Sequence, residues 1–264
     1  MKVAIAAVVS VMACWSSVAA AEPLRVMALD QCADQFVLAL APDAELGLSP
    51  RADDPDSWLR ADAQGHRRVR PTLEAAVGFR PDVAVRYWGG DARLLAALER
   101  DGVRTVTISD ATDMDWVRAN IHAVAQALGR PERGEALVQR MEAQLAKAES
   151  AGRGRKAVYV TASGFTSGPG SLMDAVLRAA GFRNAVERPG YQPLGLERVL
   201  LTPPALYVKG FFDLVRSDWR GAGRHPVMQR AMRGRTAAEL PGATLTCPAW
   251  FAADAAAQLA EQAS

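Results

Sequence analysis

The stretch RPDVAVRYWGGDARLLAALERDGVRTVTIS, residues 80–109, changes its periodicity twice. Residues 80–87 form an apolar run that predicts a strand, and residues 92–102 predict a helix that ends on Gly102. Residues 103–109 then predict a second strand. Because short strands that alternate with helices of about ten residues are typical of a parallel sheet with crossover helices, this stretch predicts an α/β fold.

The same alternation extends in both directions. Residues 24–29 predict an earlier strand, and residues 33–40 predict the helix after it. A second round begins near residue 156, with the apolar segments KAVYVTAS, SLMDAVLRAAG, LERVLLTPP, ALYVKG and ATLTCP. A chain of 264 residues exceeds the usual size of one domain, so two rounds predict two α/β lobes.

A different element separates the two rounds. The segment PERGEALVQRMEAQLAKAES starts with Pro131, which suits the first turn of a helix. It places apolar residues on one face, namely Leu137, Met141, Leu145 and Ala148. We therefore expect one long α-helix between the lobes. The predicted divisions are a signal peptide at 1–21, a first lobe at 22–130, a linker helix at 131–152 and a second lobe at 153–264.

The N-terminus resembles a secretion signal. Lys2 precedes the apolar run VAIAAVVSVMA, which is too short to span a bilayer, and small residues favour cleavage after Ala21. An alternative is a lipoprotein, because VMAC places Cys14 in a loose lipid-attachment motif. We favour export to the periplasm as a soluble protein.

The composition excludes several classes of protein. Without residues 1–21, which contain one Lys and no acid, the formal charge falls from +2 to +1, and this near-balance argues against a nucleic-acid partner. None of the three histidines, His66, His122 and His225, has a second His or Cys at ligand spacing. We therefore expect no stand-alone metal site, no cofactor and no catalytic residues.

Two aromatic residues follow the strand of the opening stretch. Tyr87 and Trp88 stand where the strand ends and the chain turns on Gly89 and Gly90, and binding residues concentrate at such junctions. The alternative is an aromatic cluster that only covers a loop. The glycine-rich turn TASGFTSGPGS carries another aromatic, Phe165, and matches no phosphate-binding or nucleophile motif.

Five segments in order resemble a known family. They are GLSPRADDP, LEAAVGFRPDVAVRYWGGD, GFTSGPGSLMDAVLRAAGFRN, LERVLLTPPALYV and LTCPAWF. Together they are similar to the cobalamin- and ferric-siderophore-binding proteins of ABC importers, the periplasmic binding proteins with one helical linker. The resemblance covers nearly the whole chain after residue 24.

This resemblance implies two Rossmann-like lobes with a ligand cleft between them. The residues that it places in the cleft are Arg51, Tyr87, Trp88, Phe165, Tyr191 and Trp250. Their aromatic rings would form a wall for a bulky metal chelate. Cobalamin or another corrinoid is the first ligand that we expect. A ferric siderophore is the second, because an arginine in the cleft suits an acidic ligand.

The implied function is capture of a small-molecule metal chelate and its delivery to the permease subunits of an ABC transporter, by a protein that we expect to be a monomer. Two alternatives remain open: a periplasmic sensor on the same scaffold, and a chelatase-like enzyme. The resemblance also implies one acidic docking residue in each lobe. In the second lobe this is Glu197. In the first lobe the position falls on Arg93, with Asp91 as the nearby substitute.

Two cysteines remain after the signal segment. Cys32 and Cys247 each follow a predicted strand, the second being ATLT, so both are expected near the cleft. An exported protein meets an oxidising compartment in which pairing is permitted. Since two separate lobes do not guarantee that α-carbons approach within about 7 Å, we expect unpaired cysteines rather than a disulfide.

Overall fold

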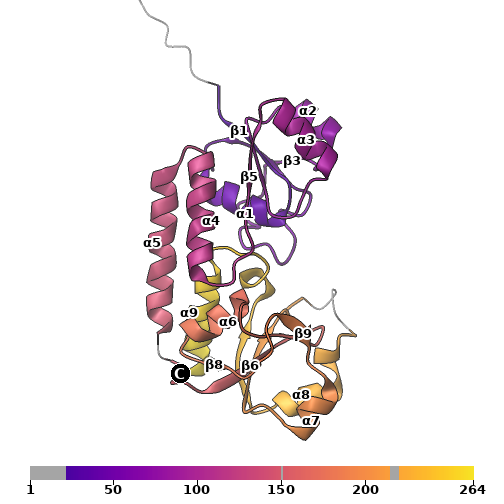
Figure 1. Cartoon of the computed structure of the whole chain (residues 1–264), viewed down its shortest axis with the longest axis vertical. Helices are drawn as coiled ribbons and strands as arrows, with labels where there is room; N and C mark the ends of the chain where they lie inside the picture. Colours follow the sequence, from indigo (N-terminus) through magenta and orange to yellow (C-terminus); the bar gives the residue numbers. More distant parts are fainter. Residues whose placement is uncertain (1–21, 150, 215–219) are drawn as a thin grey trace, which may run out of the picture.

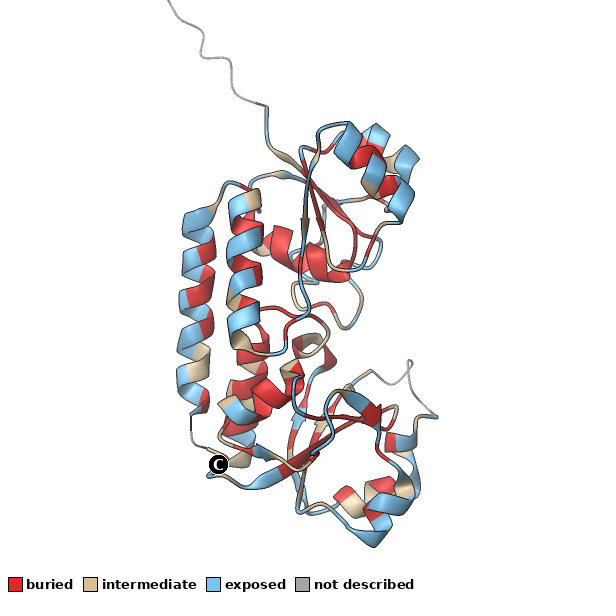
Figure 2. Cartoon of the chain, viewed as in Figure 1, coloured by how far each residue is buried: buried red, intermediate tan, exposed pale blue. Residues whose placement is uncertain are grey.

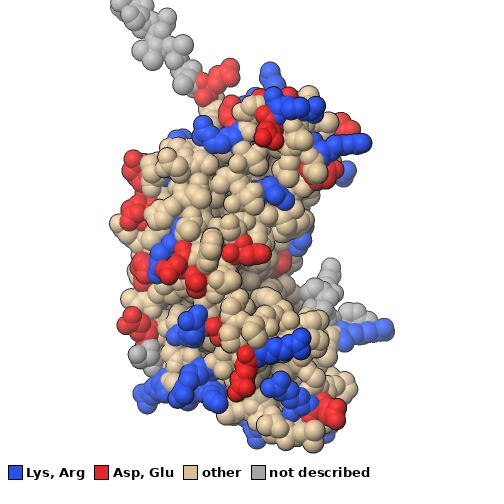
Figure 3. Space-filling model, in the orientation of Figure 1, with Lys and Arg blue, Asp and Glu red and all other residues tan. Residues whose placement is uncertain are grey.

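The computed structural model describes residues 22–149, 151–214 and 220–264. The predicted signal peptide and Cys14 therefore lie outside the described residues. Two α/β lobes follow one another along the long axis of the molecule, and two long helices run along one side (Figure 1). On the face seen in Figure 3, acidic and basic side chains are interspersed, with the basic ones gathered towards the end of the second lobe.

The first lobe is a parallel sheet with the strand order β3-β2-β1-β4-β5. Its elements are β1 (Arg25–Ala28), α1 (Gln31–Leu40), β2 (Glu45–Leu48), β3 (Arg67–Arg68), α2 (Leu73–Phe79), β4 (Val83–Arg86), α3 (Ala92–Arg100), β5 (Arg104–Thr107) and α4 (Met114–Ala127). Val26 in the central strand pairs with Leu46 on one side and Val83 on the other. Both apolar faces of the sheet are covered by helices (Figure 2).

Polar side chains start the helices of this lobe. Asp30, Thr72, Asp91 and Asp113 each precede a helix and accept a backbone N–H from its first turn. Such caps satisfy N–H groups that have no partner inside the helix. The chain therefore leaves each strand and enters the next helix at a fixed residue.

The second lobe has a parallel sheet of order β11-β10-β6-β8 and a small antiparallel pair, β7 and β9. Its elements are β6 (Lys156–Thr161), β7 (Phe165–Ser167), α6 (Leu172–Ala179), β8 (Arg183–Asn184), β9 (Tyr191–Pro193), α7 (Leu196–Leu201), β10 (Leu206–Gly210), the 3-10 turn η1 (Ala222–Arg224), α8 (Pro226–Met232), β11 (Thr236–Leu240), the 3-10 turn η2 (Gly242–Thr244) and α9 (Ala252–Ala263). The predicted fold class, two parallel α/β lobes, is confirmed.

One predicted strand is wrong. The segment ATLT, residues 243–246, holds the end of η2 and the turn after it, and the edge strand of the sheet is β11, a few residues earlier. Pro241 cannot donate to a sheet ladder. The N–H of Gly242 is instead taken up by the carboxylate of Asp213, 3.0 Å from Oδ1. The chain consequently leaves the sheet before Ala243.

The predicted linker helix is α5 (Pro131–Ala148), which has Pro131 in its first turn. It packs against α4 of the first lobe and α9 of the second. Its buried residues include Leu137 and Met141, on the apolar face that the sequence indicates. The helix therefore bridges the lobes by side-chain packing along its length.

A second connection between the lobes is a crossing segment, residues 245–251. It leaves the second lobe after η2, enters the core of the first lobe, and returns to the second lobe as α9. Trp250 is 1% exposed, and its ring meets that of Phe36 edge-on at 5.5 Å. Phe251 packs on Trp58. Residues that the sequence assigns to the second lobe therefore complete the core of the first.

Candidate ligand-binding site

A cavity of about 410 Å³ lies between the lobes. It is lined from the first lobe by Tyr87, Asp110, Ala111 and Thr112, and from the second by Tyr159, Gly170, Ser171, Leu172, Met173, Val176, Gly190 and Tyr191. The crossing segment and its neighbours close it with Thr244, Leu245, Thr246, Cys247, Pro248 and Ala252. Small-molecule sites span about 300–1,000 Å³ and combine apolar walls with a few polar groups, as this cavity does.

The loop that carries Tyr87 and Trp88 is held by a buried carboxylate. Oδ2 of Asp30 accepts the backbone N–H groups of Tyr87, Trp88 and Gly89 at 2.7, 3.1 and 2.8 Å. Its other oxygen caps α1. A side chain at Gly89 would collide with the carbonyl oxygen of Leu29 at 2.1 Å, so only glycine allows this approach. Asp30 therefore fixes the loop against the start of α1.

The phenol of Tyr87 is paired inside the cavity. Its hydroxyl donates to the carboxylate of Asp110, which follows β5. Desolvation, reinforced by this carboxylate, raises the pKa of Tyr87 well above its usual range. The first-lobe wall consequently presents a neutral phenol that is hydrogen-bonded to a carboxyl group.

Two tyrosines form the opposite wall. Tyr191 starts β9 and is 68% exposed, whereas Tyr159 lies on β6 and is buried at the back of the cavity. The pairing of β7 with β9 sets Tyr191 opposite Ser167. Ser171 adds a hydroxyl at the cap of α6. The second lobe therefore offers phenol and hydroxyl groups on a largely apolar surface.

The structure brings together some of the predicted site residues. Tyr87, Tyr191 and Cys247 line the cavity. Trp88 and Phe165 do not line it. Trp88 is 56% exposed on the loop of Tyr87, and Phe165 is 44% exposed at the start of β7, the strand that pairs with β9. Arg51 does not line it either, and its Nε donates to Asp54 at 2.7 Å.

The cleft position predicted for Trp250 needs correction. Its ring is buried in the first-lobe core, with the indole N–H lacking a hydrogen-bond partner. Apolar burial of a large ring against Phe36 and Phe251 outweighs the missing partner. Trp250 therefore belongs to the first-lobe core and does not line the cavity.

The expectation of unpaired cysteines is wrong. Cys32 and Cys247 form a disulfide with a Cα–Cα distance of 5.4 Å. Residues of two separate lobes need not approach each other, but the crossing segment brings Cys247 into the first lobe. The bridge thus closes a connection across 215 residues of chain.

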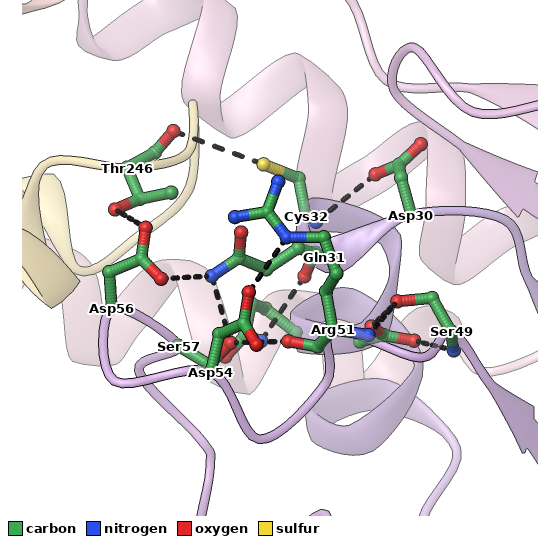
Figure 4. A network of polar contacts seen from close by, with 11 residues as sticks. Asp30, Gln31, Cys32, Ser49, Arg51, Asp54, Asp56, Ser57 and Thr246 are labelled. Carbon is green, nitrogen blue, oxygen red and sulfur yellow. Dashed lines mark hydrogen bonds and ion pairs between the residues drawn. The ribbon is translucent and has the colours of Figure 1, made fainter. Parts of the chain in front are cut away.

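Polar contacts surround this bridge (Figure 4). Gln31 donates to Asp56 and to Ser57, both at 2.9 Å. The hydroxyl of Thr246 lies 3.4 Å from the other carboxylate oxygen of Asp56. Through Asp56, a first-lobe loop therefore reaches both the start of α1 and the crossing segment.

Several site residues had escaped the sequence analysis: Asp30, Asp110, Tyr159 and Ser171. The motif D-Q-C-A at the end of a strand is a helix-cap signal, so the position of Asp30 was open to prediction, although its contacts with residues 87–89 were not. Within the described ranges, no group of three or more His, Cys, Asp or Glu residues is placed to hold a metal ion. The described helices are also too short or too polar to cross a membrane.

Two parallel α/β lobes joined by one long helix, with a cavity between them, define a two-lobed α/β binding protein. The family model described as "Periplasmic binding protein" matches residues 36–208, which is more than half of the chain. The chain belongs to this family. No curated protein sequence matches the chain.

Solved structures share the fold. The periplasmic heme-binding protein RhuT from Roseiflexus sp. RS-1, in its apo form, aligns with a TM-score of 0.68 and 21% identity over 91% of this chain and 97% of its own. The vitamin B12-binding protein BtuF of Vibrio cholerae aligns at 0.66 and 20% over 91% and 96%. BhuT in complex with two hemes gives 0.66 and 21% over 91% and 99%. The resemblance inferred from sequence is confirmed for the family.

Proposed function

We propose that this protein is the substrate-binding component of an ABC importer, and that it captures a metal chelate between its lobes. The observation that carries the proposal is the cavity with Tyr87 on one wall and Tyr191 on the other. Structural neighbours described as heme- and B12-binding proteins support the chelate class. A binding role, without chemistry on the ligand, fits a cavity built mainly from apolar and hydroxyl side chains.

Within this class we propose a flat ferric chelate of the heme type as the first ligand. Phenol oxygens are hard donors, and a tyrosine is one of the protein ligands that hold haem iron. Both Tyr87 and Tyr191 present such oxygens. The order expected from sequence was a corrinoid first and a ferric siderophore second, and we now place a heme-type chelate before both. The corrinoid is the second candidate, supported by the fold shared with BtuF. The exposed rings of Trp88 and Phe165 would extend the contact at the rim.

The test is a titration of purified protein with hemin, cyanocobalamin and a ferric carboxylate siderophore, followed by absorption spectroscopy. Hemin should bind with a shifted Soret band. Tyr87→Phe and Tyr191→Phe should each weaken the binding of hemin about tenfold, equivalent to about 1.4 kcal/mol. Tyr207→Phe is the matched control, since its buried hydroxyl has no partner and does not line the cavity. Tight binding of cyanocobalamin alone would select the second candidate, and binding of none would end the proposal.

The docking prediction also changes with the structure. Asp91 caps α3 by accepting the N–H of Leu94 at 2.8 Å, so its carboxylate already has a role. Helix α7 carries Glu197 as its second residue and leads into β10. Strand β10 pairs with β6, the first strand of the second lobe. Helix α2 carries Glu74, also as its second residue, and leads into β4. Strand β4 pairs with β1, the first strand of the first lobe. We propose that Glu74 and Glu197 contact the permease.

Both helices expose apolar side chains beside these acids. Leu73 and Val77 are exposed on α2, and Leu200 and Leu201 are exposed on α7. Exposed apolar groups of this size are typical of contact surfaces. A sensor would use the same cavity without a permease. Ligand-dependent stimulation of a reconstituted transporter distinguishes the importer from the sensor.

A further inference from the structure

The disulfide Cys32–Cys247 stands at the junction of three features of the molecule. It joins the first turn of α1 to the crossing segment. Cys247 also forms part of the cavity wall, with Thr246 and Pro248 as its neighbours. The bridge therefore belongs both to the connection between the lobes and to the surface that a ligand touches.

The bridge is closed off on its other sides. Cys32 and Cys247 are 2% and 3% exposed, and the crossing segment continues into the packed rings of Trp250 and Phe251. Sγ of Cys32 lies 3.9 Å from the carbonyl oxygen of Thr246. A reductant in solution consequently meets the bridge from the cavity side, where Cys247 contributes to the wall.

We propose that this disulfide is a redox-sensitive brace of the cavity, and that a bound ligand shields it from reduction. In the empty protein a small dithiol enters the cavity and its thiolate attacks the sulfur of Cys247. Cys32 leaves as a thiolate and takes up a proton. The second thiol of the reductant then attacks the mixed disulfide and releases Cys247 as a thiol. The reductant loses two electrons and two protons, and the protein gains them.

Reduction would change the cavity because it breaks the covalent bond that ties Cys247, and with it the neighbouring Thr246, to α1 of the first lobe. Thr246 keeps its 3.4 Å contact with Asp56. The rings of Trp250 and Phe251 anchor the end of the segment. Its beginning, which carries the wall residues, would be free to move, so the reduced protein should hold its ligand more weakly. The occupied protein would remain oxidised and keep its ligand.

The access route is tested without any ligand. Native protein is treated with dithiothreitol, and the rate at which Cys32 and Cys247 become alkylated is followed by peptide mass spectrometry. Thr112→Trp places a large ring at the cavity wall and should slow reduction about fivefold or more. Thr105→Trp, on an exposed residue of β5 away from the cavity, is the matched control and should leave the rate unchanged. Equal rates for both variants would overturn the route through the cavity.

The shielding by ligand rests on the proposed function and is tested separately. Gallium(III) protoporphyrin is used because a dithiol does not reduce it. Saturation with this probe should slow reduction about fivefold or more, and reduced wild-type protein should bind it about tenfold more weakly than oxidised protein. If Thr112→Trp slows reduction and the probe does not, the route holds and the heme-type ligand is rejected. If reduced and oxidised protein bind the probe equally, the brace is rejected.

Discussion

The two lobes have the same α/β construction and differ in how they complete their cores. The second lobe covers its sheet with its own helices α6 and α9, to which the linker helix α5 adds Ala148. The first lobe has α1 and α4 on the corresponding face and also needs Trp250 and Phe251 from the crossing segment. The first lobe is therefore not an independent folding unit. The crossing segment therefore fastens the lobes together, and a large hinge opening would expose its apolar side chains.

The two connections restrict different motions. Helix α5 runs along the side of both lobes and packs against α4 and α9. The crossing segment enters the first lobe near the cavity and is bridged there to Cys32. A rotation about α5 would thus strain the disulfide and the aromatic cluster together. The cavity is consequently largely formed before a ligand arrives.

The largest effect is expected for Trp250→Ala. Removal of this fully buried ring leaves a cavity in the first-lobe core and should lower the free energy of unfolding by about 3–5 kcal/mol. Guanidinium denaturation followed by circular dichroism measures the loss. Trp116→Ala, on a half-exposed residue of α4, is the matched control and should cost below about 1 kcal/mol.

Denaturation of Trp250→Ala also tests whether the first lobe depends on the crossing segment for its stability. If the first lobe depends on the crossing segment, Trp250→Ala should unfold the first lobe before the second, and tryptophan and far-ultraviolet signals should separate. One sharp transition with an unchanged midpoint would show that the ring contributes little. In that case the first lobe would not depend on the Trp250 ring for its stability.

The second effect depends on pH and lies in the first lobe. Asp34 on α1 is fully buried and accepts the N–H and the hydroxyl of Ser49, at 2.8 and 2.6 Å. Burial raises its pKa to about 7, with Asp30 adding a smaller effect in the same direction, opposed by hydrogen bonds from Ser49 and by Arg68. Ionisation of this group therefore disfavours the folded state.

The sign of the expected dependence follows from this direction. Because the folded protein holds the proton of Asp34 more tightly than the unfolded chain, stability should fall as pH rises from about 4 to about 7, by at most about 4 kcal/mol. Asp34→Asn should remove the fall, since the Ser49 hydroxyl can accept from the new amide. Urea denaturation at several pH values measures it.

Asp43, an exposed acid of the same lobe, is the control, because its pKa is shifted in the opposite direction from that of Asp34. A hydrogen bond from Arg130 lowers the pKa of Asp43. The stabilisation of the fold by Asp43 should be present above the pKa that Asp43 has in the unfolded chain, and it should be lost as pH falls below about 4. Asp43→Asn should therefore leave the slope between pH 4 and 7 unchanged. A slope that persists in Asp34→Asn would assign the titration to another group.

Much of the fold could be predicted from sequence because its signals are local. The alternation around residues 80–109 and the apolar face of α5 depend on neighbours within a few residues. Tyr87 of the cavity directly follows β4, at the carboxyl end of a parallel strand, where an α/β sheet binds its ligands. Trp250 follows a turn in the same manner, yet it is buried. Periodicity cannot distinguish a rim aromatic from one that enters another lobe.

The contacts that could not be predicted are distant in sequence. The bridge between Cys32 and Cys247 depends on where the crossing segment runs. Asp30 was readable as a cap, but its bonds to the Tyr87 loop span 57 residues. The equivalence of Glu74 with Glu197 became visible only when the strands were paired. Each of these requires the tertiary path of the chain.

The third effect compares one helix cap from each lobe: Asp30, which holds the loop of the cavity residue Tyr87, and Ser171, which lines the cavity. Asp30 caps α1 and holds three N–H groups of the Tyr87 loop, whereas Ser171 caps α6 and bonds within its own turn. Asp30→Ala should cost about 2–3 kcal/mol in unfolding free energy, against about 1 kcal/mol for Ser171→Ala. It should also weaken ligand binding, because the loop loses its anchor. Denaturation and titration with hemin measure both, and equal losses for the two variants would deny Asp30 its second role.

The smallest effect concerns the two acids that we place at corresponding positions. Charges at the rim of an interface act mainly on the rate of association. Glu74→Lys and Glu197→Lys should each slow association with the reconstituted permease about threefold or more in low salt, and leave the affinity for hemin unchanged. Asp91→Asn is the comparison, since Asp91 caps α3 and should affect stability more than association. Stopped-flow mixing at two salt concentrations measures the rates. If only Glu197→Lys slows association, the two lobes dock on the permease by different contacts. If Asp91→Asn slows association and Glu74→Lys does not, Asp91 is the docking residue of the first lobe, as expected from the sequence. Because α2 and α7 enter their sheets identically, we expect the two lysine variants to match each other, and their double variant to slow association by about the product of the single effects.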